Sequence, residues 1–276
     1  MYHNDLYYNQ DNPEIEDAQY DELMRQLKKL EAENPELITK DSPTQKVGGV
    51  AKREAGVLVK HDVPMLSLQD VFSAEEVETF VDNMQKELDN PEFVVEEKID
   101  GLSLALRYVD GELKLAVTRG DGVVQGEDVT ANAMQIKDIK KKLKEKLPYL
   151  EVRGEVYMTR EAFSLVNEKQ ELLGKRLFAN PRNCAAGTLR QLDSKITKER
   201  NLSMFIFNLQ KVEGIELKSH TQAYEFMHKQ GMKIIHSYKV CKTKKEVLQA
   251  IEEIGNRRGD LDYDIDGAVV KINVQH

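Results

Sequence analysis

The chain has 276 residues, of which 40% are apolar and 32% are charged, and its formal net charge is −8 at pH 7. This composition is not that of a disordered or fibrous chain, and the length accommodates one large domain with a small one beside it. The negative charge argues against a nucleic-acid-binding surface that is basic throughout, so any contact with nucleic acid would need a local group of cations.

The sequence carries no signal for a membrane or for secretion. No apolar run reaches the roughly 20 residues that a spanning helix needs, and the polar start at Met1 lacks the pattern of a signal peptide. The two cysteines, Cys184 and Cys241, are too few for a disulfide framework or a four-cysteine zinc site. We therefore expect a cytoplasmic protein with no membrane partner and no metal-binding cluster of its own.

The first part of the chain is predicted to be a small helical module. Apolar residues recur every three or four positions between residues 20 and 30, as on one face of an amphipathic helix. Pro35 ends this pattern, because proline disfavours helical angles in the residue before it. Residues 34–64 then lose periodicity and collect proline and glycine, which indicates a connector. We divide the chain into a helical module with its connector, residues 1–60, and a main domain, residues 61–276.

The main domain alternates strand and helix signals. Capping boxes at 73–76 and 243–246 each precede an apolar stripe, which predicts a helix after each of them. Asp110 and Gly111 form a strong hairpin signal between two apolar segments. The predicted strands are 93–98, 102–109, 112–118, 150–158, 203–209 and 268–272. Hairpins among mixed helices predict an α+β domain rich in antiparallel sheet, not a doubly wound parallel sheet.

The sequence Glu-Glu-Lys-Ile-Asp-Gly at 96–101 is the first candidate for chemistry. On a strand, Glu96, Lys98 and Asp100 would face the same side because they are two residues apart. Gly101 would allow a bend or a close ligand approach. A lysine held at a strand end, able to lose its proton, is a plausible covalent nucleophile.

Two further motifs follow in the predicted strands. Glu155 lies among apolar residues in Arg-Gly-Glu-Val-Tyr at 153–157, and Lys271 ends Asp-Gly-Ala-Val-Val-Lys at 266–271. Charged side chains on a buried strand are costly unless they are paired or bind a ligand. In this order, the three motifs resemble the nucleotidyltransferase motifs of polynucleotide ligases and RNA-capping enzymes.

Longer blocks narrow the resemblance, and they extend over nearly the whole chain. They occur at residues 11–21, 67–72, 118–122, 178–183 and 186–193. These blocks are similar to the signatures of NAD⁺-dependent DNA ligases. The resemblance implies an antiparallel-rich, ATP-grasp-like nucleotidyltransferase domain. It also implies that the helical opening module binds the nicotinamide mononucleotide (NMN) half of NAD⁺.

The resemblance assigns roles to individual residues. Lys98 matches the lysine that becomes adenylated, Glu96 the adenine contact and Glu155 the residue that holds the AMP ribose. Arg119 and Lys271 match positions near AMP and its phosphate. The nucleotide site that it implies also includes Ser67, Leu68, Asp100 and Gly101. The NMN site that it implies consists of Tyr7, Asp17, Tyr20 and Asp21. Arg182 and Arg190 match arginines associated with nucleic-acid phosphates, which suits the guanidinium group.

The implied reaction consumes NAD⁺ as an AMP donor and does not use it as a hydride carrier. Lys98 would attack the α-phosphorus, release NMN and form lysyl-AMP, with Mg²⁺ or Mn²⁺ held mostly by water and phosphate. The implied partners are NAD⁺, AMP and NMN, with nicked duplex DNA in the full-length enzyme, and we expect a monomer. The chain ends at His276, before the family's oligonucleotide-binding, zinc, helix-hairpin-helix and terminal interaction domains. We therefore expect self-adenylation only.

Two alternatives stay open at this point. One is a nucleotidyltransferase that uses ATP or GTP, which the tyrosines and aspartates of the opening module argue against. The other is a noncatalytic nucleic-acid-binding module, which the net negative charge disfavours.

Overall fold

A computed structural model describes residues 25–26, 29, 58–60, 74–119 and 125–275. The predicted helix at 20–30 falls almost wholly outside the described residues. The predicted site residues Tyr7, Asp17, Tyr20, Asp21, Ser67 and Leu68 also lie outside them.

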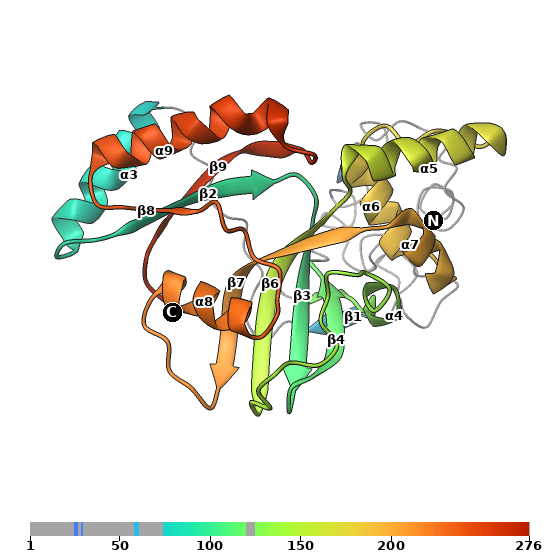
Figure 1. Cartoon of the computed structure of the whole chain (residues 1–276), viewed down its shortest axis with the longest axis horizontal. Coiled ribbons are helices and arrows are strands. Elements are labelled where there is room, and N and C mark those ends of the chain that lie inside the picture. Colours follow the sequence, from blue (N-terminus) through green and yellow to red (C-terminus); the bar gives the residue numbers. More distant parts are fainter. Residues whose placement is uncertain (1–24, 27–28, 30–57, 61–73, 120–124, 276) are drawn as a thin grey trace.

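The smaller of two main sheets has the order β8-β2-β9, and its strands are antiparallel. Its members are β2 (Phe93–Ile99), β8 (Lys239–Cys241) and β9 (Ile265–Ile272). Helices α3 (Ala74–Glu87) and α9 (Lys244–Arg257) lie over this sheet (Figure 1). Their apolar stripes pack with the strands into one hydrophobic core.

The larger sheet has the order β4-β3-β6-β7 and is also antiparallel. Its strands are β3 (Leu102–Val109), β4 (Glu112–Thr118), β6 (Tyr149–Tyr157) and β7 (Ser203–Glu213). A second, larger core lies between this sheet and the helices that pack on it. The predicted α+β fold rich in antiparallel sheet is therefore confirmed.

The remaining helices belong to the larger sheet's part of the molecule. Helices α5 (Arg160–Leu172), α6 (Pro181–Leu189) and α7 (Ser194–Arg200) gather beyond one end of the sheet (Figure 1). Helices α4 (Thr130–Ala133) and α8 (His220–Lys229) also lie in the described part of the chain, and a 3₁₀ turn, η6 (Arg258–Asp260), follows α9. In the part of the chain that is described, no helix is both long and apolar enough to cross a membrane.

A short two-stranded sheet includes part of the predicted connector. Strand β1 (Leu58–Lys60) pairs with β5 (Gln125–Glu127), so the segment that we interpreted as a connector contains a strand. Three residues are too few to produce a readable alternation in the sequence. The pairing joins residues 58–60 to the main domain, and the division at residue 60 stays a prediction.

Local sequence signals account for the central elements. Asp110 and Gly111 both have positive φ, 51° and 77°, as a two-residue type I′ hairpin between β3 and β4 requires. Thr243 caps α9 by accepting a hydrogen bond from the backbone N–H of Glu246, as the capping box predicts. The predicted strand bounds agree closely, except that β7 extends to Glu213 and β9 begins at Ile265.

The chain first passes from the smaller sheet to the larger at a short junction, and it returns to the smaller sheet between β7 and β8. Asp100 and Gly101 alone separate the end of β2 from the start of β3. This junction places the lysine motif where the two sheets meet.

Candidate active site

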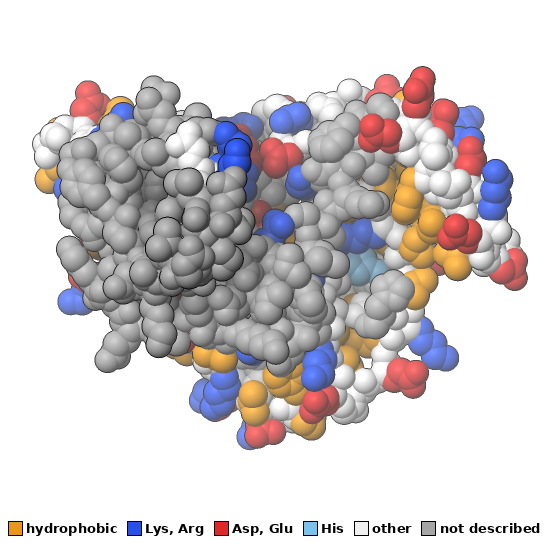
Figure 2. All heavy atoms as spheres, turned by 180° about the vertical axis from the view of Figure 1, so that it is seen from behind, with side chains coloured by type: hydrophobic (Ala, Val, Ile, Leu, Met, Phe, Trp, Pro, Cys, Tyr) orange, Lys and Arg blue, Asp and Glu red, His pale blue; other side chains and the backbone are white. Residues whose placement is uncertain are grey.

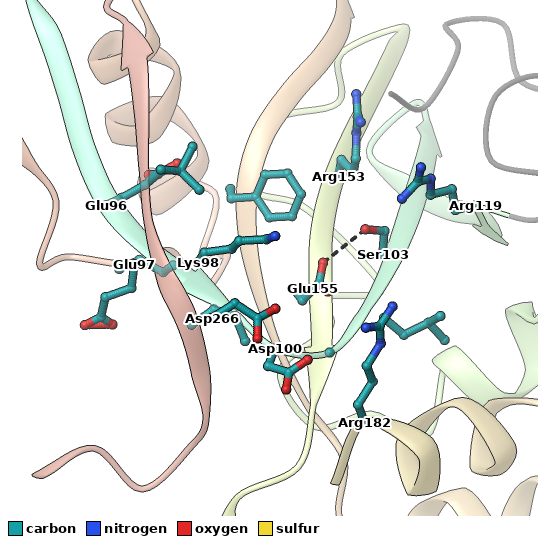
Figure 3. Close-up of a pocket in the computed structure, with 16 residues that line it drawn as sticks. Glu96, Glu97, Lys98, Asp100, Ser103, Arg119, Arg153, Glu155, Arg182 and Asp266 are labelled. Atoms are coloured by element: carbon teal, nitrogen blue, oxygen red, sulfur yellow. Dashed lines mark hydrogen bonds between the residues drawn. The ribbon is translucent and has the colours of Figure 1, made fainter. Parts of the chain in front are cut away.

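A cavity of about 190 Å³ lies at the meeting of the two sheets (Figure 3). Strands β2 and β9 of the smaller sheet line one side of it. Strands β3, β6 and β7 of the larger sheet line the other, together with Arg182 of α6. Charged side chains from elements far apart in the sequence therefore converge on one space.

Lys98 projects from β2 into this cavity, and the side chain of its neighbour Glu97, which also contributes to the cavity wall, points away from Lys98 (Figure 3). The register between β2 and β9 shifts between Lys98 and Ile99, which marks an irregularity at the lysine itself. The residue paired with Lys98 is Gly267, whose φ of 134° is rarely adopted by residues with a side chain. Such an irregularity re-aims side chains near it, and here it lies where the lysine enters the cavity.

Glu96 and Lys271 form an ion pair with each other in the interior. The hydroxyl of Tyr224 donates a hydrogen bond to Glu96. Lys271 Nζ donates to the Phe207 carbonyl at 3.3 Å and lies 3.3 Å from His220 Nε2. Burial, and then the nearby Lys271 charge, lowers the pKa of His220 to about 3, so its ring is neutral. Glu96 contributes to the cavity wall, while Lys271 is not among the described residues that line the cavity.

Gly101 is required by the close approach of β3 and β6. A Cβ at this position would overlap the carbonyl oxygen of Val156, so no residue with a side chain fits without a backbone shift. The same approach sets Ser103 opposite Glu155 in the strand register, and Ser103 Oγ donates to Glu155 Oε2 at 3.1 Å. Burial raises the pKa of Glu155 to about 7, although the Ser103 hydrogen bond opposes this.

This pKa predicts a pH-dependent contribution of Glu155 to stability. The carboxyl group titrates near 4.5 in the unfolded chain and near 7 in the folded one, so folding favours its protonated form. Its stabilising contribution is complete below about pH 4.5 and is lost as the pH rises to 7. Urea unfolding at pH 4.5 and pH 7 should show Glu155→Gln gaining stability relative to wild type at the higher pH. The same pH dependence in both proteins would contradict the assignment.

Three arginines supply positive charge to the cavity. Arg119 at the end of β4, Arg153 of β6 and Arg182 of α6 all line it (Figure 3). The pKa of Arg153 is lowered to about 10, first by burial and also by the charge of Arg119. Holding two cations close together in a buried wall is costly, and an anionic ligand would offset this cost.

Two aspartate carboxyl groups also line the cavity. Asp100 and Asp266 lie below Lys98 in Figure 3. Burial raises the pKa of Asp100, and the neighbouring charge of Asp266 raises it further, while Arg182 and Lys98 oppose the shift. The cavity therefore brings Lys98 together with three arginines and two aspartates, with Arg182 near Asp100 (Figure 3). This arrangement suits an attack by the lysine on a phosphorus atom whose oxygens face the arginines.

Comparison with known proteins identifies the domain that carries this cavity. Residues 56–276 match a family described as the NAD-dependent DNA ligase adenylation domain. The chain belongs to this family. Residues 1–48 match a second family, the DNA ligase-like, N-terminal NAD+-binding domain. The predicted resemblance to NAD⁺-dependent DNA ligases is confirmed.

Curated relatives agree with the adenylation-domain match. The DNA ligase of Clostridium kluyveri is 55% identical over 272 residues, which cover 99% of this chain and 41% of that protein. The DNA ligase of Acetivibrio thermocellus is 51% identical over 273 residues, with the same coverage of both chains. That of Clostridioides difficile is 49% identical over 273 residues, 99% of this chain and 40% of the relative. The chain thus spans about 41% of the length of the first two relatives.

Arg190, which we expected to contact nucleic-acid phosphates, is buried within the domain. Its Nε donates to Glu127 Oε2 at 3.1 Å, joining the end of α6 to β5. In the described structure the guanidinium group of Arg190 forms an ion pair with Glu127. The predicted contact of Arg190 with nucleic-acid phosphates stays a prediction.

The structure adds cavity residues that the sequence reasoning did not single out. They are Glu97, Ile99, Leu102, Ser103, Arg153, Phe207, Ile235, Asp266 and Val269. Two of them had a readable signal. Arg153 is two residues from Glu155 on a strand and so shares its side, and Asp266 begins the motif that ends at Lys271. Phe207 and Ile235 had none, because only the folding of distant segments brings them to the cavity.

Proposed function

We propose that this chain performs the first step of NAD⁺-dependent DNA ligation, the transfer of AMP from NAD⁺ to Lys98. The neutral amine attacks the α-phosphorus and forms an N–P bond. The bond to the bridging oxygen breaks, its electron pair leaves with NMN, and the amine proton passes to solvent. The observation that carries this proposal is the position of Lys98, which enters a cavity lined by three arginines and two aspartates.

The other cavity residues have roles that follow from their chemistry. Glu155, held by Ser103, would bind the AMP ribose hydroxyls, since a carboxyl group accepts hydrogen bonds from hydroxyls. Arg119, Arg153 and Arg182 would bind the phosphate oxygens and stabilise the charge that develops as the lysine attacks. Glu96 would contact adenine, and Lys271, its ion-pair partner, would lie near the nucleotide.

We include Mg²⁺ as the expected metal, with Mn²⁺ as its substitute. The donors present suit it, because Asp100 and Asp266 supply carboxylate oxygens beside Lys98, and their mutual repulsion would be relieved by a cation. Among the described residues no group of three or more His, Cys, Asp or Glu side chains is arranged to hold a metal. The ion would therefore keep mostly water and phosphate ligands, and it would supply charge neutralisation at the phosphate.

The later steps belong to the complete ligase. There, AMP would pass from Lys98 to the 5′-phosphate of a nicked duplex, and the 3′-hydroxyl would then seal the nick. Tyr7, Asp17, Tyr20 and Asp21 of the opening module would hold the NMN half of NAD⁺, with Ser67 and Leu68 near the nucleotide. We place the reaction in the cytoplasm and treat the chain as a monomer.

The test of this proposal compares two AMP donors. Incubation with NAD⁺ labelled in its adenylate half, with Mg²⁺, should label the chain covalently, and ATP labelled at its α-phosphate should not. Labelling from ATP alone would favour the ATP-dependent alternative.

The noncatalytic nucleic-acid-binding alternative predicts no label from either donor. Figure 2 shows cationic and anionic side chains mixed over the described part of one face, not a basic stripe. This distribution does not favour that alternative.

A further inference from the structure

Glu97, the residue beside Lys98, is an anchored carboxylate. Its side chain is 1% exposed, and it points away from the Lys98 side chain (Figure 3). It accepts hydrogen bonds from Tyr263 Oη at 2.7 Å, Arg257 Nε at 3.2 Å and Ser237 Oγ at 3.2 Å. These donors come from three segments: the loop before β9, the end of α9 and the turn before β8. A buried carboxylate with this many donors is held in one position.

Fixing Glu97 constrains the direction of Lys98. Successive side chains of a strand point to opposite faces, so the orientation of one residue limits that of the next. The constraint matters here because the regular register with β9 ends between Lys98 and Ile99, opposite Gly267. Past that point the pairing with β9 is irregular, and the Glu97 contacts hold the residue directly before Lys98.

The ring of Tyr263 also contacts two strands of the larger sheet. Its ring centroid lies 5.3 Å from that of Tyr157 and 5.4 Å from that of Phe205, and Tyr157 stacks on Phe205 at 5.1 Å. Phe205 is the strand partner of Glu155. One tyrosine therefore binds the strand of Lys98 through its hydroxyl and contacts the strands beside Glu155 through its ring.

We propose that Tyr263 is a positioning residue for adenylation, which fixes Lys98 relative to Glu155 through its hydrogen bond to Glu97. The inference rests on the proposed function of Lys98. Removing the hydroxyl leaves the ring contacts between the sheets but releases one of the three donors that hold Glu97. The lysine then samples more orientations, and fewer of them are in line with the α-phosphorus.

The test uses Tyr263→Phe with Tyr108→Phe as the matched control. Tyr108 is fully buried whereas Tyr263 is partly buried, and Tyr108→Phe likewise loses one hydroxyl hydrogen bond, 2.6 Å to the Lys140 carbonyl, but Tyr108 lies outside the cavity. In single-turnover adenylation, Tyr263→Phe should lower the rate at saturating NAD⁺ about tenfold and leave the NAD⁺ concentration at half-maximal rate within about twofold. Tyr108→Phe should keep the wild-type rate. Equal rates in the two variants would overturn the inference and leave Tyr263 a structural residue.

Two further measurements separate this inference from the proposed function. If the wild-type chain takes up no AMP, the proposed function of Lys98 is refuted, but the proposal that Tyr263 holds Glu97 in place is not. Amide hydrogen exchange of residues 96–99 would still test whether the Tyr263–Glu97 hydrogen bond holds this strand. Exchange should be faster in Tyr263→Phe than in wild type and unchanged in Tyr108→Phe. Unchanged exchange in Tyr263→Phe would overturn the inference. If Tyr263→Phe does not fold, Glu97→Gln keeps the side-chain shape and weakens the same hydrogen bonds. It should then give the same loss of rate at saturation, and an unchanged rate would overturn the inference.

Discussion

Lys98→Ala should lose AMP transfer from NAD⁺, with a fall of at least about 1,000-fold in the single-turnover rate. The reason is that the variant has no nucleophile in the cavity: Lys98 is the one lysine among the described residues that line it. Lys98→Arg should fail equally, because a guanidinium group does not lose its proton in proteins. The measurement is covalent label per chain after incubation with labelled NAD⁺ and Mg²⁺.

Lys114→Ala is the matched control for this loss. Lys114 is exposed on β4, where it pairs with Glu112 at 3.3 Å, and it lies outside the cavity. Its removal should leave both folding and adenylation at wild-type levels, since exposed ion pairs contribute little. Label retained on Lys98→Ala at a wild-type rate would contradict the assignment of the nucleophile.

Gly101→Ala should both destabilise the domain and impair the site. The added Cβ would overlap the backbone carbonyl of Val156, so β3 and β6 must separate locally. Overpacking of this kind costs about 1–3 kcal/mol, and more where backbone has to move. Because Gly101 follows Lys98 by three residues and precedes Ser103 by two, the same shift displaces the lysine and the Glu155 partner. We expect a lower free energy of unfolding in urea and at least about a tenfold loss of adenylation rate.

Gly255→Ala is the same substitution at another glycine, and there we expect an increase in stability. Gly255 lies within α9, and a Cβ there meets no atom within 4 Å. Alanine stabilises a helix interior by about 0.5–1 kcal/mol relative to glycine. Gly255→Ala should therefore unfold at higher urea concentration than wild type and keep its activity. A Gly101→Ala chain as stable as wild type would show that β3 and β6 can separate without cost.

The sequence predicted those parts of the fold that depend on local signals. The alternation of apolar residues located the main strands, and Asp110 with Gly111 located the hairpin because both residues tolerate positive φ. Gly101 was predicted to allow a close approach, and the structure shows the neighbour, the backbone of Val156. Lys98 and Asp100 line the same cavity, as expected for residues two apart at a strand end.

Other features depend on contacts between distant segments and left little local pattern. Helix α6 was not predicted because its residues 184–185 and 187–189 are all buried, which leaves only a weak amphipathic pattern in its sequence. The burial of Arg190 with Glu127 depends on a strand 63 positions earlier in the chain. The pairing of Glu96 with Lys271 likewise depends on the register of β2 with β9. Sequence motifs identified these charged residues but not their partners.

The most direct test of the central claim is to locate AMP on the wild-type chain. After incubation with NAD⁺ and Mg²⁺, intact mass spectrometry should show a gain of one AMP per chain. Fragmentation of the peptide that contains residues 96–101 should then place that mass on Lys98. AMP found on any other residue, or no adduct on a folded chain, would contradict the account.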